Sequence, residues 1–195
     1  AARTRVQHEP HALRFVETFH ADAGYIKALA QSINDYWMKN GRPDHLVLSF
    51  HGVPRRTLEM GDPYHCFCQI TGRMLVRELG LSVLPWSESL QQWRERVRSL
   101  REWMPDLGLP DLSDEALLST LEEWLQPAFA GKTRLDALGE EELAGALKSS
   151  VDWSLRQRID QLAPTRISVP SGMERRIDYT HGQSPVLAVK LQELF

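Results

Sequence analysis

The sequence has little of what defines several classes of protein. Its 195 residues include only two cysteines, Cys66 and Cys68, which cannot form a disulfide framework and are typical of a reducing compartment. No apolar run approaches the roughly 18 residues needed to cross a bilayer, and the start, Ala1–Arg5, lacks an initiator Met and a secretory signal. We therefore expect an internal piece of a cytoplasmic protein.

Recognisable nucleotide-binding motifs are also lacking. Gly131-Lys132-Thr133 resembles part of a phosphate loop, but that pattern needs a glycine where Gln126 stands. It also needs a preceding buried strand, where residues 122–125 are predicted to be helical. No G-x-G-x-x-G occurs anywhere in the chain. We interpret Gly131–Thr133 as an interhelical turn.

The net charge of −3 excludes a uniformly basic surface for nucleic acids, but it hides an uneven distribution. Residues 1–80 carry 10 Lys and Arg against 8 Asp and Glu, whereas residues 81–195 carry 13 against 18. Six of the seven histidines and both cysteines precede residue 81, and five of the six tryptophans follow it. These differences together indicate two segments of different origin.

The first segment predicts helix, strand, loop and helix in that order. Asp22 can cap a helix with apolar residues at spacings of three and four, and Asn40-Gly41 is a stop signal. The short apolar run Leu46–Phe50 predicts a buried strand, and a polar loop then leads to a second helix that ends near Gly80. This order is typical of a parallel α/β sheet.

The second segment predicts a helical bundle followed by a small antiparallel sheet. Helices are expected between Pro85 and Pro105, from Ser113 onward, and around residues 141–148 and 152–162. The tryptophans are expected in the core, at Trp86, Trp93, Trp103, Trp124 and Trp153. Period-two segments at 166–169, 175–179 and 186–190 then predict strands. Because residues 191–195 end without a turn or polar tail, we expect this β region to be truncated.

His51 is the strongest candidate functional residue. It directly follows the predicted strand, at the carboxyl end where α/β sheets place their ligand sites, and Gly52 permits a tight turn there. An imidazole accepts a proton near neutral pH or binds a divalent metal. The alternative is that His51 only caps the strand and hydrogen-bonds its own loop.

The other candidate groups have weaker patterns. The remaining histidines of the first segment match no zinc-site spacing, and we expect surface or loop positions for His8, His11, His20, His45 and His65. A single Cys66-x-Cys68 does not complete a metal site, so free thiols are expected. An arginine cluster in the last forty residues either forms a basic face for phosphates or, as we favour, a solvated surface balanced by carboxylates: Arg156, Arg158, Arg166, Arg175 and Arg176.

The run from Ser49 to Arg56, with S-x-H-G, and the run from Gly61 to Cys68, with G-D-P-Y, closely resemble ferrochelatase, the terminal enzyme of haem synthesis. The resemblance covers about residues 10–79. It implies a chelatase-like α/β domain with ferrous iron and protoporphyrin IX as substrates and no permanently bound cofactor. His51 would be the catalytic residue that accepts pyrrole protons, handles the metal, or does both.

The same resemblance gives expectations for the loop and its chemistry. Ser49, Asp62 and Tyr64 would contribute to substrate binding, the latter two by shaping the loop. Insertion of a dication into a porphyrin releases two protons, so a neutral imidazole at the metal face is chemically useful. The family's further strands, and an acidic residue facing the histidine, are not found in this sequence.

From about residue 80 the sequence instead resembles the C-terminal region of HrpB-type ATP-dependent helicases. The clearest stretches are residues 111–118, 162–165 with 169–172, and 185–195. The resemblance implies an accessory module that binds nucleic acid or protein, with Arg156, Arg158 and Arg175 as candidate nucleic-acid contacts. The ATPase motifs of a helicase are absent.

Together these features predict a chimeric chain of mixed α and β structure. Residues 1–79 form a ferrochelatase-like α/β fragment with a parallel sheet, residues 80–163 a helical accessory region, and residues 164–195 a small antiparallel β region. The predicted function is ferrochelatase-type lyase activity centred on His51. The alternatives are a non-catalytic accessory domain, or no function in either segment because the predicted strand has no neighbours.

Overall fold

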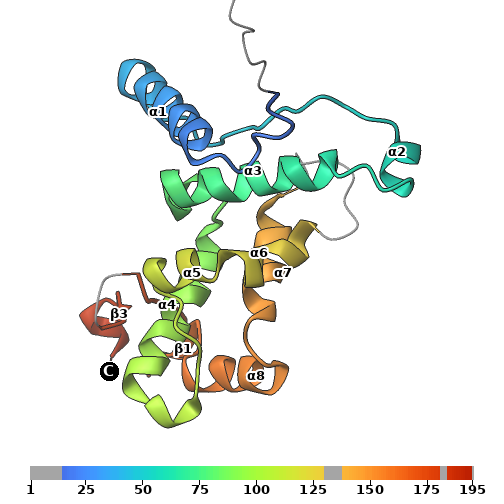
Figure 1. Ribbon diagram of the computed structural model, residues 1–195. Coiled ribbons are helices and arrows are strands. Elements are labelled where there is room, and N and C mark those ends of the chain that lie inside the picture. The colour runs from blue at the N-terminus through green and yellow to red at the C-terminus, as the bar shows by residue number, and fades with distance from the viewer. Residues whose placement is uncertain (1–14, 130–137, 181–183, 195) are drawn as a thin grey trace, which may run out of the picture.

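A computed structural model describes residues 15–129, 138–180 and 184–194 (Figure 1). Short 3-10 turns lie at Leu81–Val83, Pro105–Leu107 and Leu191–Glu193. The helices and strands, in chain order, are α1 (Ala23–Asn40), α2 (Arg55–Glu59), α3 (Tyr64–Leu79), α4 (Glu88–Trp103), α5 (Asp114–Ser119), α6 (Leu121–Phe129), α7 (Glu140–Ser149), α8 (Trp153–Leu162), β1 (Arg166–Ser168), β2 (Glu174–Asp178) and β3 (Val186–Leu187).

The two long helices of the first segment begin and end where the sequence predicts. The Asp22 carboxylate accepts a hydrogen bond from the backbone N–H of Tyr25 at 2.8 Å and so caps α1. Gly80 ends α3 with φ at +85°, a conformation that glycine adopts without strain, and its N–H donates to the carbonyl of Val76 at 2.8 Å. The capping signals in this segment are therefore confirmed.

The predicted buried strand at residues 46–50 is wrong. This segment has no regular secondary structure and pairs with no strand in the described part of the chain, and Val47 is 73% exposed. The predicted parallel sheet is likewise not confirmed, since the sheet seen among the described residues is antiparallel and lies in the second segment. The physical reason is that a strand's backbone N–H and C=O groups need a neighbouring strand, which the apolar pattern alone does not supply.

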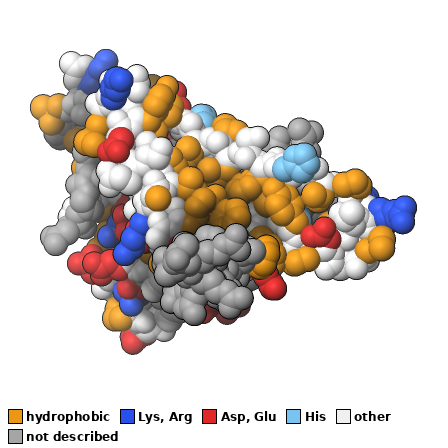
Figure 2. Space-filling view, turned by 45° about the horizontal axis from the view of Figure 1, so that its top comes forward, with side chains coloured by type: hydrophobic (Ala, Val, Ile, Leu, Met, Phe, Trp, Pro, Cys, Tyr) orange, Lys and Arg blue, Asp and Glu red, His pale blue; other side chains and the backbone are white. Residues whose placement is uncertain are grey.

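Large apolar side chains of the first segment are correspondingly uncovered. Figure 2 shows hydrophobic side chains forming a band across the middle of the visible surface. Among the residues that precede α4, the most exposed large apolar side chains are those of Phe15, Val16, Phe19, Tyr36, Met38, Val47 and Met60. An α/β domain buries such faces between its helices and its sheet, so this segment has only a small core of its own.

The second segment matches its predicted elements closely. The predicted helix from Ser113 divides at Thr120 into α5 and α6, while α4, α7 and α8 lie where expected. β1, β2 and β3 form one antiparallel sheet in sequential order, with Ile167 opposite Arg175 and Ile177 opposite Leu187. The prediction of a helical bundle with a small antiparallel sheet is confirmed.

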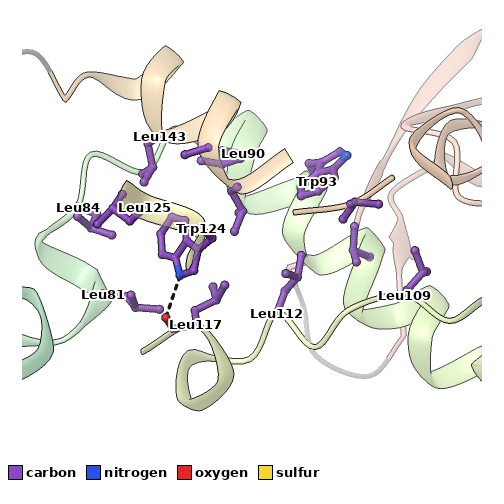
Figure 3. Close-up of a cluster of buried hydrophobic side chains, with 14 of the residues drawn as sticks. Leu81, Leu84, Leu90, Trp93, Leu109, Leu112, Leu117, Trp124, Leu125 and Leu143 are labelled. Atoms are coloured by element: carbon purple, nitrogen blue, oxygen red, sulfur yellow. Dashed lines mark hydrogen bonds between the residues drawn. The ribbon is translucent and has the colours of Figure 1, made fainter. Parts of the chain in front are cut away.

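The main hydrophobic core lies in this second segment. Leu121, Leu143 and Leu147 are fully buried at its centre. Trp93 and Trp124 are buried as expected, and the indole Nε1 of Trp124 donates to the carbonyl of Leu117 at 2.9 Å (Figure 3). The expectation is wrong for Trp103 and Trp153, which are 45% and 65% exposed. Their spacing marks the apolar faces of two helices, but Trp103 is the last residue of α4 and Trp153 the first residue of α8, where little packs against them.

Helix α3 joins the small and large cores. Its Leu75 packs with Ile26 and Ala30 of α1, whereas the next residue, Val76, belongs to the large core of the second segment. Figure 1 shows α1 and α3 above the helical body formed by the later helices. Consecutive residues of one helix therefore face the two segments, and the chain is continuously packed across residue 80.

Candidate functional site

The His51 loop is anchored at the start of α3. The backbone N–H of His51 donates to the phenolic oxygen of Tyr64 at 3.2 Å. The backbone N–H of Tyr64 donates in turn to a carboxylate oxygen of Asp62 at 2.9 Å. These two hydrogen bonds position the loop through its backbone, while the side chains of His51 and Ser49 are exposed.

Two groups near this loop, the Tyr64 phenol and the Cys68 thiol, stay uncharged at neutral pH. Burial is the main cause that raises the pKa of Tyr64, with a further contribution from Cys68. Burial also raises the pKa of the Cys68 thiol, which therefore remains protonated. Both cysteines are free thiols, as expected. The imidazole of His51, by contrast, is exposed to solvent.

Two other histidines of the first segment, His20 and His65, contact neighbouring side chains. The imidazole of His20 stacks on the ring of Phe67 with centroids 3.7 Å apart, and its Nδ1 is buried without a partner. His65 shares a hydrogen bond of 2.8 Å with the side-chain amide of Gln69. His45 is exposed, whereas His8 and His11 lie outside the described residues, as do Gly131, Lys132 and Thr133. In the described ranges no group of three or more potential metal ligands gathers.

The sequence missed a second feature, an apolar pocket of about 200 Å³ beside α3. On one side it is lined by Leu46 and Leu48 from residues 46–50 and by Leu75 of α3. Leu84 and Leu125 of the main core also line it. These residues are far apart along the chain, so no local pattern indicates that they meet. Arg73 of α3 also lines the pocket.

Ion pairs engage part of the arginine cluster near the end of the chain, for which we favour a solvated surface balanced by carboxylates over a basic face. Arg175 donates from Nε to Glu193 at 2.7 Å, and its Nη2 contacts the other oxygen of the same carboxylate. This pair raises the pKa of Arg175 and lowers that of Glu193. Arg176 pairs with Glu88 at 2.7 Å. Arg175 is therefore occupied, which leaves it poorly placed to contact a phosphate.

Arg156 and Arg158 on α8 differ from these paired arginines. Arg158 is exposed, and no ion pair holds it among the described residues. Arg156 is half-buried and its Nε lacks a partner. In the parts of the chain described here, no helix is both long and apolar enough to cross a membrane.

Comparison with protein families gives one match in the first part of the chain and one in the last part. The family described as ferrochelatase matches residues 1–105, and the family described as ATP-dependent helicase C-terminal matches residues 124–195. Both predicted resemblances are confirmed. Residues 106–123 lie between the two matched ranges.

Individual relatives repeat this division. The chain is 63% identical over 70 residues to the ferrochelatase of Nitrosomonas europaea, and 54% identical over 100 residues to that of Janthinobacterium sp.. These alignments cover 36% and 51% of this chain, but only 19% and 26% of the relatives. The ATP-dependent RNA helicase HrpB of Escherichia coli is 38% identical over 120 residues, which cover 62% of this chain and 15% of that protein.

A solved structure shows the same likeness in three dimensions. The crystal structure of the Escherichia coli DEAH/RHA helicase HrpB superposes with a TM-score of 0.57 at 35% identity. The match covers 64% of this chain and 16% of that one. The chain thus spans at most about a quarter of the relatives named here, so their whole activities do not transfer to it directly.

Proposed function

We propose, for a chain that belongs to the ferrochelatase family through residues 1–105, that its function is the proton-accepting and metal-handling part of porphyrin metallation. The observation that carries this proposal is the exposed imidazole of His51, held by the backbone hydrogen bond to Tyr64. His51 would lie at the face of protoporphyrin IX where ferrous iron enters. Ser49, Asp62 and Tyr64 would contribute to substrate binding, the latter two by shaping the loop.

The chemistry requires a base that is neutral at physiological pH. When the porphyrin exchanges its two pyrrole N–H protons for Fe²⁺, each nitrogen keeps its electron pair and both protons leave. The His51 imidazole accepts one proton and passes it to solvent before it accepts the second. Its exposure allows this exchange, but the same exposure leaves the porphyrin without an enclosing cleft, so we expect slow turnover.

A metallation assay with the whole chain tests this proposal. Purified protein is incubated anaerobically with ferrous iron and protoporphyrin, and the metalloporphyrin is followed by absorbance. His51→Ala should lower the rate by about 10²-fold or more, as expected for loss of a general base. His45→Ala removes another exposed histidine of the same segment and should leave the rate unchanged. Equal turnover by wild type and His51→Ala would overturn the assignment.

A second candidate function belongs to the helicase-like segment. We propose that residues 80–195 act as a non-catalytic accessory module that binds RNA or DNA. The observation favouring this is the exposed Arg158 on α8, for which no ion pair is seen among the described residues, with Arg156, whose Nε lacks a partner, two positions earlier on the same helix. Each phosphate contact should contribute about one unit to the salt dependence of binding.

Salt-dependent binding distinguishes this function from the first. Arg156→Gln with Arg158→Gln should weaken binding of a single-stranded oligonucleotide at low salt and reduce the slope of log K against log salt by up to about two. Arg98→Gln is the matched control, because Arg98 is paired with Glu95. Absence of measurable binding at low salt would rule out nucleic acid and leave protein binding.

The division of the chain is also a proposal. We place a join near residue 80, between a fragment at 1–79 and the regions 80–163 and 164–195, because all buried residues of the large core except Val76 follow residue 80. Free Cys66 and Cys68 support a cytoplasmic location. Sequencing the parent gene tests the join: an uninterrupted reading frame across the codons for residues 78–84 supports it, and an interruption there removes it.

A further inference from the structure

Arg73 is a buried cation, and two of its three guanidinium nitrogens, Nε and Nη1, have no hydrogen-bond partner among the described residues. Its side chain lies on α3 and the residue is 9% exposed, while its Nε and Nη1 are buried without a hydrogen bond. The nearby carboxylate of Glu122 is engaged by Arg77. Burial lowers the pKa of Arg73, but a guanidinium keeps its proton in proteins. The charge therefore stays in place, and no carboxylate is hydrogen-bonded to its buried Nε or Nη1, which destabilises the chain.

The pocket beside Arg73 is otherwise mostly apolar. It has a volume of about 200 Å³, whereas an engineered cavity of about 150 Å³ is large enough to hold benzene. Figure 3 shows Leu84 and Leu125 close together at the edge of the main core, and both line the pocket. Asp44 and Gln69 are polar lining residues. An apolar cavity with a few convergent polar groups is the usual form of a small-molecule site.

The pocket is built by both segments of the chain. Residues 44–48 and α3 come from the ferrochelatase-like side, whereas residues 83–85, Leu125 and Leu138 come from beyond residue 80. The packing of the two segments against each other therefore creates this cavity. It is separate from the His51 loop, which is not among its lining residues.

We propose that this pocket binds a small apolar monocarboxylate, with the carboxylate on Arg73 and the hydrocarbon body against the leucines. A carboxylate supplies the negative charge and the acceptor oxygens that the buried guanidinium lacks. The hydrocarbon part of the ligand displaces water from the apolar wall of the pocket. A phosphate is disfavoured, because its greater charge would be desolvated opposite one cation in a pocket that Asp44 also lines.

Binding of hexanoate and benzoate to the full chain, followed by NMR titration, tests the proposal. The neutral controls are 1-hexanol and benzyl alcohol, which have similar bodies and no charge. Because a hydrogen-bonded ion pair with a buried group is lost in the alcohols, each acid should bind at least about tenfold more tightly than its alcohol. Equal affinity of acid and alcohol, or no saturable binding of either acid, would overturn the proposal.

Two variants separate the charge from the cavity. Arg73→Met should abolish the preference for the acids and also raise the thermal unfolding midpoint, because it removes a buried charge whose Nε and Nη1 lack hydrogen-bond acceptors. Gly72→Leu should weaken acids and alcohols alike, since a Cβ at Gly72 lies 3.6 Å from a Leu48 methyl and the added side chain fills the pocket. Retained acid preference in Arg73→Met, or unchanged affinity in Gly72→Leu, would refute the assigned site.

Discussion

The side-chain amide of Gln92 binds the end of β2 through Tyr179: its Oε1 accepts a hydrogen bond from the Tyr179 backbone N–H at 3.0 Å. The amide Nε2 of Gln92 donates to the Asp178 carboxylate at 2.8 Å. Tyr179 is buried, and its hydroxyl donates to the carbonyl of Pro164 at 2.8 Å. One amide on α4 thus holds the small sheet against the helical bundle.

Gln92→Ala should lower the free energy of unfolding by about 1–3 kcal/mol, because it leaves the buried Tyr179 N–H without an acceptor. The exposed neighbour provides the control: Gln91→Ala should change stability by less than about 0.5 kcal/mol. Urea denaturation followed by tryptophan fluorescence measures both. Equal effects of the two variants would show that the amide does not hold the sheet.

A second polar contact closes the end of α8. Buried Arg96 donates from Nε to the carbonyl of Ala163 at 2.6 Å and from Nη2 to the Asp160 carboxylate at 2.7 Å. Arg96→Met should destabilise the chain by about 1–3 kcal/mol, since a buried carbonyl loses its donor. Arg98→Met, on the exposed side of the same helix, should have little effect in the same denaturation experiment. A neutral Arg96→Met would contradict this role.

The ion pair of Arg175 and Glu193 predicts a pH dependence of stability. The hydrogen bond from Arg175 lowers the pKa of Glu193 in the folded chain, so the pair stabilises the fold above the unfolded pKa of about 4.3. That contribution is lost as the pH falls through the lowered, folded value. Glu193→Gln should therefore be less stable than wild type at pH 7, and the difference should shrink toward zero at strongly acidic pH. Glu174→Gln, whose carboxylate lies 3.7 Å from Arg166, should show a smaller dependence. A difference independent of pH would exclude the pair as its cause.

Substitutions at two aliphatic residues compare the main core with residues 46–50. Leu143 is fully buried in the main core, and Leu143→Ala should cost about 2–5 kcal/mol. Val47 lies in the run predicted as a buried strand but is 73% exposed, so Val47→Ala should cost less than about 0.5 kcal/mol. Thermal and denaturant unfolding measure both. A cost above 2 kcal/mol at Val47 would show that this segment is buried after all.

Local signals predicted most of the secondary structure. The cap at Asp22, the stop at Gly80 and the three-four periodicity of α4 each depend on residues close in sequence. The same is true of the antiparallel sheet, whose strands follow one another directly. Residues 46–50 failed because a strand also depends on a partner that the pattern of its own side chains does not specify.

The candidate sites divide in the same way. The sequence alone determined that His51 follows an apolar run with a G-D-P-Y motif downstream, and that arginines cluster near the end of the chain. Only the tertiary structure decided that Arg175 pairs with Glu193. It also decided that Arg73 lines a cavity while its Nε and Nη1 have no hydrogen-bond partner among the described residues. Hydrogen bonding and burial depend on which distant residues meet, and packing of the whole chain determines those meetings.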